Sequence, residues 1–221
     1  MRTYRIHHER TRFREFVNLS YPRVIRGAIA WLPLKFGLLS WKPQIIPHAD
    51  TIADHMVSES QLPDFAKPFI SESVANAATL GFIDPTFECI ESQGRRVVGV
   101  CARCCHTSGR YIFQSLFSFA GPAHSSEQHV VSFFEGGVTL ASSNGHPKFD
   151  RHPSAEAYYY PNCKLSALLA SHDAKLAQRV TSPIIVSETD KLIKMVDAMR
   201  DRFLDYMLSR GLYEEIEPTQ N

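Results

Sequence analysis

A short run of cysteines is the first place in this sequence where side chains could do chemistry. Cys101, Cys104, Cys105 and His106 stand together in the segment CARCCH. A structural zinc site needs four ligands, and its recognisable form has two Cys pairs at fixed spacing, whereas one pair is present here. In an extended strand, Cys101 and Cys104 also point to opposite faces. We therefore interpret these cysteines as small apolar residues of a central strand, and we predict no metal and no cofactor.

A second set of chemically capable residues is dispersed in the sequence but could meet in the fold. These candidate catalytic residues are His124, His129, His146, Asp150 and His152. The first two bracket the loop before one expected strand, and the last three lie in the loop after the next. If the two strands form a hairpin, both loops lie at the same end of it. One hypothesis is therefore a metal-dependent enzyme, such as a hydrolase, and the competing interpretation is a set of solvated loop histidines.

Motifs that would commit the chain to a reaction are missing. The sequence has no Gly-x-Ser-x-Gly elbow, no Walker loop and no Gly-x-Gly-x-x-Gly. Cys105 and His106 are neighbours on an expected strand, so their side chains diverge and cannot act as a nucleophile and its base. A non-enzymatic binding or scaffolding protein is the favoured prediction.

Charge is distributed unevenly along the chain. Residues 1–48 hold nine Lys and Arg but two acids, a net charge of +7, and the remainder carries −6. Such asymmetry indicates an anionic partner for the N-terminal arm, or an arm that packs on its own acidic body or on a second copy of the chain. The arginines expected to bind an anionic surface are Arg2, Arg5, Arg10, Arg12, Arg14, Arg23 and Arg26.

The arm also contains the segment 23–41, which is strongly apolar. Its apolar residues recur at helical spacing, but Arg26, Pro33 and Lys35 interrupt it, so a membrane span of about 20 apolar residues is not expected. We expect Pro33 to end or kink the helix. A helix lying in the membrane interface is compatible with this pattern, which favours an anionic membrane surface or an acidic protein as partner. Nucleic acid is not expected, because the rest of the chain is acidic.

The elements that must position these residues are helices, then strands, then helices. Alternating apolar residues between Arg95 and Asn144 predict successive strands, and Gly136-Gly137 predicts a two-residue hairpin turn. The predicted fold class is α+β, with an antiparallel sheet of about five strands covered by C-terminal helices. The expected division is an extension over 1–48 and a single domain over 49–221.

The sheet itself offers a further functional hypothesis. Tyr111, Phe113, Phe117 and Phe119 share one strand face, which we expect the last helix to cover. If that helix left a cavity over Phe113, Phe117 and Phe119, the chain would be a small-molecule binder. With five cysteines and no apolar leader at the N-terminus, we expect a cytoplasmic protein that associates with a membrane.

Overall fold

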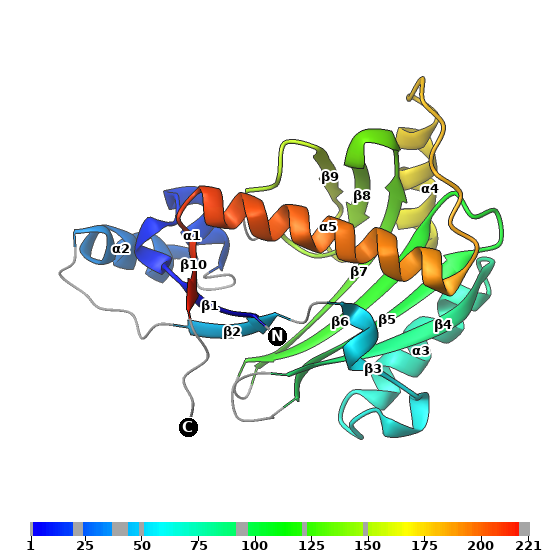
Figure 1. Cartoon of the computed structure of the whole chain (residues 1–221), viewed down its shortest axis with the longest axis horizontal. Coiled ribbons are helices and arrows are strands. Elements are labelled where there is room, and N and C mark those ends of the chain that lie inside the picture. Colours follow the sequence, from blue (N-terminus) through cyan, green and yellow to red (C-terminus); the bar gives the residue numbers. More distant parts are fainter. Residues whose placement is uncertain are drawn as a thin grey trace. The chain divides into compact units, whose positions relative to one another are not determined.

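The computed structural model describes residues 2–19, 24–36, 44–48, 51–91, 97–120, 123–147 and 150–216. The chain forms two compact units. Figure 1 shows the chain coloured by position in the sequence. The smaller unit comprises Met1–Asp50, His146–His152 and Asp201–Asn221, and the larger comprises Thr51–Gly145 and Pro153–Arg200. This division differs from the expected boundary after residue 48, because two segments distant in sequence join the N-terminal residues.

A seven-stranded sheet forms the centre of the larger unit (Figure 1). Its strands, in spatial order, are β3 (Met56–Val57), β4 (Phe82–Glu91), β5 (Val97–His106), β6 (Ile112–Ala120), β7 (Ala123–Phe133), β8 (Thr139–Ser143) and β9 (Ala155–Tyr159). All neighbours are antiparallel except β8 and β9, which are parallel. The α+β class is confirmed, but a purely antiparallel sheet of about five strands was wrong. The long connection over residues 144–154 permits the parallel pair, because it is not a tight turn.

Helices cover both faces of this sheet. One face, called the aromatic face, carries Tyr111, Phe113 and Phe117, and it packs against α3 (Lys67–Ala78) and α4 (Leu165–Leu176). The opposite face packs against the start of α5 (Thr189–Ser209) through a core that contains Ile112 and Leu192. The expectation that the last helix covers the aromatic face was therefore wrong. Periodicity shows that a helix has an apolar stripe, but it does not say which face of a sheet receives that stripe.

The turns of the larger unit follow the local sequence closely. The connection from β7 to β8 is the short 3-10 helix η4 (Glu135–Gly137), in which Gly136 and Gly137 have φ of 69° and 76°. The hairpin and its positive φ angles are confirmed, although the connection is longer than a two-residue turn. Two further 3-10 helices, η2 (Ile52–His55) and η3 (Glu59–Gln61), precede α3.

The smaller unit contains a sheet of its own. Its elements are β1 (Arg2–Ile6), η1 (His8–Arg10), α1 (Phe13–Leu19), α2 (Val24–Lys35), β2 (Gln44–His48), the end of α5 and β10 (Tyr213–Ile216). The strand order is β10-β1-β2, and both pairs are antiparallel. The N-terminal residues are thus a central strand and not an irregular arm. That pairing joins the two ends of the chain, so it could not be read from local periodicity.

Candidate functional site

Helix α2 of the smaller unit presents an exposed apolar stripe. Ile25, Ile29, Leu32 and Phe36 are 77%, 70%, 53% and 73% exposed. At 3.6 residues per turn, these four positions fall within about 60° of the helix circumference. Phe36 directly follows α2 and still donates its N–H to the carbonyl of Leu32 at 3.1 Å, so it continues the helical spacing. Four large apolar side chains aligned in this way form a surface that a partner could cover.

The other side of α2 holds the helix in the smaller unit. Leu34 is 4% exposed, and the ring of Trp31 meets that of Phe13 edge to face at 5.3 Å. The indole N–H of Trp31 donates to the carbonyl of Thr11 at 3.3 Å. Because this packing already occupies one side of α2, the exposed stripe is a second apolar face that folding of the smaller unit leaves uncovered.

Basic residues flank the stripe and acids are absent from it. At 100° per residue, Arg26 and Lys35 project about 80–100° to either side of the stripe. The sequence contains no Asp or Glu from Phe16 to Ala49. Lys35 also reaches the backbone carbonyl of Glu9, at 3.2 Å. An apolar stripe with cationic margins is the pattern of a helix that lies in a membrane interface.

The seven arginines expected to bind an anionic surface have different environments. Four of them contact groups within the smaller unit: Arg2 contacts Asp201, Arg5 contacts Glu214, Arg10 donates to the carbonyl of Gly211, and Arg12 contacts Asp150. Arg14 and Arg26 are exposed, and neither forms an ion pair with another described residue. Arg23 lies outside the described residues. Among the predicted set, Arg14 and Arg26 are thus the described cations available to a partner.

Two of the candidate histidines lie on a strand, and two lie in the connection that follows the next strand. His124 and His129 both lie within the 11-residue strand β7 and not in a loop before it. The side chain of His124 lies outside the described residues. His129 belongs to the larger unit, whereas His146, Asp150 and His152 belong to the smaller one.

The structure gives Asp150 and His152 local partners. Arg12 contacts the carboxylate of Asp150, and the ring of His152 meets that of Tyr206 edge to face at 5.7 Å. Within the described ranges, no group of three or more His, Cys, Asp or Glu side chains could hold a metal ion. The hypothesis of a metal-dependent enzyme therefore gains no support from these residues.

The cysteines are part of the sheet core, as expected. Cys104 packs in the core of the aromatic face and Cys105 in that of the opposite face. Burial raises the pKa of Cys101 to about 11 and that of Cys104 to about 12. Both thiols are therefore protonated near neutral pH and are poor nucleophiles.

A buried histidine network in the larger unit escaped the sequence analysis. His172 of α4 is 0% exposed, and its Nε2 and Nδ1 lie 2.9 Å and 3.1 Å from the hydroxyls of Ser132 and Ser142. The Ser132 hydroxyl donates to the carbonyl of Arg110, so it accepts from Nε2–H of a neutral imidazole. Burial, together with the positive charge of Arg110, lowers the pKa of His172 to about 4. The spacing of these residues in sequence gives no signal of this contact.

A charged network lies on the opposite face of the same sheet. The guanidinium of Arg103 donates to the carboxylate of Glu88 at 2.6 Å, and both residues are buried. Arg200 lies 3.7 Å from Glu88 and 3.6 Å from Asp197, which also accepts the backbone N–H of Ile52 at 2.9 Å. Each carboxylate has a cationic partner, so the network fastens α5 and η2 to the sheet and leaves no free acid or base.

Two of the three phenylalanines expected to line a cavity on the aromatic face are buried. Phe113 is 0% and Phe117 7% exposed, and the ring of Phe117 lies 5.1 Å from that of Phe69 on α3. The side chain of Phe119 lies outside the described residues. The hypothesis of a small-molecule binder that uses this face has no support here. Comparison of the chain with models of protein families, with characterised proteins and with solved structures finds no match.

Proposed function

We propose that this chain is a peripheral membrane-binding protein whose helix α2 lies in the interface of an anionic lipid bilayer. The observation that carries the proposal is the exposed stripe of Ile25, Ile29, Leu32 and Phe36 between two basic margins. Each apolar side chain that passes from water into the acyl region contributes about 1.5–3 kcal/mol. Four such side chains suffice for reversible binding without a membrane span, and no described helix is long and apolar enough to cross a bilayer.

Charge supports a lipid surface more strongly than an acidic protein. The smaller unit carries 13 Lys and Arg against nine Asp and Glu, and the larger carries 11 against 14. Anionic headgroups lie beside an apolar interior, so one surface provides partners for both the stripe and its flanking cations. An acidic protein would need an apolar groove bordered by carboxylates to do the same. We therefore favour a cytoplasmic protein that associates with a membrane.

Sedimentation of the full chain with lipid vesicles tests the proposal. We expect binding to vesicles of phosphatidylcholine mixed with phosphatidylserine and much weaker binding to phosphatidylcholine alone. Ile29→Glu places a charge in the centre of the stripe and should weaken binding at least about tenfold, the equivalent of one lost apolar contact. Arg26→Glu should weaken binding to the mixed vesicles and have little effect on phosphatidylcholine.

Two matched substitutions in the larger unit serve as controls. Ile83→Ser alters an apolar residue that is 44% exposed, and Lys191→Glu reverses an exposed charge on α5. Both should bind vesicles like the natural chain. Negligible binding of the natural chain to the mixed vesicles would refute the proposal. Equal losses of vesicle binding in the control and stripe variants would also refute it. If the chain binds neither kind of vesicle but binds an acidic protein, the stripe is a protein-binding surface instead.

A further inference from the structure

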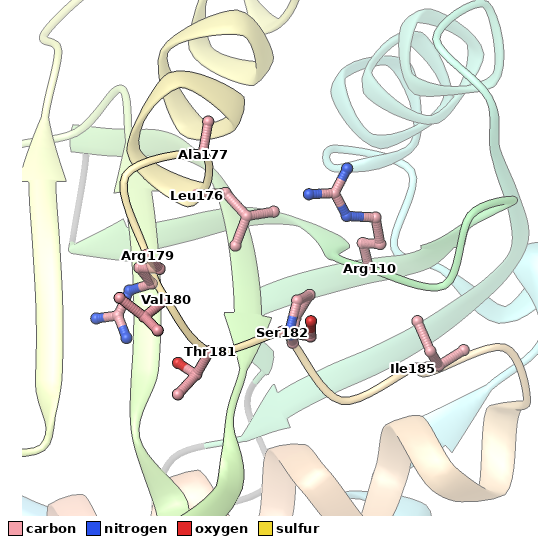
Figure 2. Close-up of a pocket in the computed structure, with 9 residues that line it drawn as sticks. Arg110, Leu176, Ala177, Arg179, Val180, Thr181, Ser182 and Ile185 are labelled. Atoms are coloured by element: carbon pink, nitrogen blue, oxygen red, sulfur yellow. The ribbon is translucent and has the colours of Figure 1, made fainter.

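A groove opens in the larger unit beside the C-terminal end of α4 (Figure 2). Its volume is about 410 Å³, within the range of about 300–1,000 Å³ typical of small-molecule sites. The groove lies between Arg110, at the turn from β5 to β6, and the segment 176–185 that leaves α4. All of its lining residues belong to the larger unit, so this site is separate from the stripe on α2.

Arg110 is the cation of the groove that has no partner among the described residues. Its side chain is exposed, and no described carboxylate or carbonyl pairs with its guanidinium. Its positive charge is felt by neighbouring groups, since it disfavours protonation of both His106 and His172. A guanidinium presents two parallel donors that match a carboxylate, so Arg110 can anchor an organic anion.

The backbone holds Arg110 in place before any ligand arrives. Its N–H donates to the hydroxyl of Ser108 at 3.3 Å, and its carbonyl accepts the hydroxyl of Ser132 at 2.9 Å. Ser132 is in turn fixed by His172, at 2.9 Å. The base of the side chain is therefore positioned, and a ligand would need to order only the outer part of the side chain.

The second arginine of the groove has a different role. The guanidinium of Arg179 contacts Glu156 and lies over the ring of Phe134, 4.3 Å from its centroid. Its charge is thus already partnered, and it forms a fixed side of the groove. The last carbonyls of α4 are also occupied, because those of Asp173 and Leu176 accept the N–H groups of Ala177 and Arg179. These occupied carbonyls reduce the repulsion that a helix C-terminus would exert on an anion.

Besides its two arginines, the groove is lined by apolar side chains, among them Leu176 and Ile185, and by the hydroxyl side chains of Thr181 and Ser182. Ile185 is 48% exposed, and both of its chain neighbours form backbone hydrogen bonds of 2.7 Å. The N–H of Ile184 donates to the carbonyl of Phe133, and the N–H of Val186 donates to the carbonyl of Gly109. Figure 2 shows Leu176 and Ile185 around the space that Arg110 borders. The groove therefore combines the guanidinium of Arg110, which has no partner among the described residues, with aliphatic and hydroxyl side chains.

We propose that this groove binds a small carboxylate with a short apolar tail, with Arg110 holding the carboxylate and Leu176 and Ile185 contacting the tail. Hexanoate is a suitable probe, and its binding can be followed by NMR titration of the backbone amides in the full chain. We expect shifts centred on residues 108–110 and 176–186. Hexanol and hexylammonium should produce no chemical-shift changes of comparable size, because neither has an anionic group that can pair with the guanidinium.

Variants of two residues test the assignment. Arg110→Gln should weaken hexanoate binding at least about tenfold, the usual effect of losing a charge-assisted hydrogen bond. Ile185→Asp should also weaken it, by repelling the anion and removing the apolar contact. Lys164→Gln removes an exposed positive charge outside the groove, just before α4, and should leave binding unchanged.

Several results would overturn the proposal. They are the absence of shifts with hexanoate, equal binding by Arg110→Gln and the natural chain, and shifts confined to residues outside the groove. Hexyl phosphate is the final arm of the titration. If it binds and hexanoate does not, the groove recognises phosphate and the carboxylate assignment is wrong.

Discussion

At the scale of single residues, His172 shows how burial decides the chemistry of a side chain. The imidazole has no exposed surface, and both of its nitrogens are hydrogen-bonded to serine hydroxyls. Both partners are themselves buried and uncharged, so the site suits a neutral ring and offers no negative charge to stabilise an imidazolium. His172 is therefore a structural part of the packing between α4 and the sheet.

This environment predicts a pH dependence of stability. The pKa of His172 falls from about 6.5 in the unfolded chain to about 4 in the folded one, so the unfolded state binds more protons between these values. Stability should therefore decrease as pH falls from about 6.5 to 4, by about 3 kcal/mol from this residue. Urea unfolding followed by circular dichroism would measure it. His172→Gln should be less stable at neutral pH, but its free energy of unfolding should change less between pH 6.5 and 4. An unchanged dependence of that free energy on pH would contradict the assignment.

At the scale of elements, the loop after α4 depends on a glycine in the turn between β5 and β6. Gly109 has φ of +66°, and a Cβ added there would lie 2.5 Å from Cγ2 of Ile185. The carbonyl of Gly109 also accepts the N–H of Val186. Glycine is needed here for two reasons, the left-handed backbone and the close approach of the loop.

A matched pair of substitutions separates these two reasons. Gly136 has nearly the same φ, +69°, but a Cβ there would meet nothing within 4 Å. Gly136→Ala should therefore cost only the left-handed penalty, about 1–2 kcal/mol. Gly109→Ala should cost at least about 1 kcal/mol more, because Ile185 must move. Chemical denaturation of both variants measures the two losses of unfolding free energy. Equal losses would mean that Ile185 and its loop move aside at no cost.

At the scale of the whole molecule, the smaller unit is assembled from three separate stretches of chain. Glu15 on α1 joins them, since it is 1% exposed and its carboxylate accepts both terminal nitrogens of Arg210, at 2.6 Å and 2.7 Å. It also accepts the backbone N–H groups of Arg12 and Asp150. Burial alone would raise the pKa of Glu15, but the hydrogen bonds from Arg210 and the backbone outweigh it and hold the pKa below its usual value.

Loss of this carboxylate should destabilise the smaller unit. Glu15→Gln leaves Arg210 without its charged partner and should cost about 3–5 kcal/mol. Because the folded pKa is lowered, this contribution is present near neutral pH and is lost as pH falls through that pKa. Both tryptophans, Trp31 and Trp41, belong to the smaller unit, so their fluorescence reports its unfolding.

An exposed ion pair in the same unit provides the control. Arg5 lies 3.6 Å from Glu214, and their side chains are 43% and 51% exposed. Arg5→Gln should therefore cost less than about 1 kcal/mol. If the fluorescence transition of Glu15→Gln moved no further than that of Arg5→Gln, Glu15 would not be the residue that joins the three stretches.

The sequence by itself determined the local features of this protein. The α+β class, the hairpin at Gly136-Gly137 and the opposite faces of Cys104 and Cys105 all follow from period-two alternation and glycine chemistry, which act over a few residues. The apolar period that includes Ile25, Ile29 and Leu32 was visible in the same way. Phe36 was missed, because Pro33 was expected to end or kink the helix, and α2 continues past it to Lys35.

Only the tertiary structure decided which distant segments meet. The pairing of β1 with β10, the parallel pair β8 and β9, and the packing of α3 and α4 on the aromatic face each join residues far apart in sequence. The same holds for the partners of Glu15 and His172 and for the place of Arg110 in the groove. Periodicity shows that a side chain will be buried. Its contacts depend on how the whole chain buries its apolar surface and pairs its hydrogen-bonding groups at the same time.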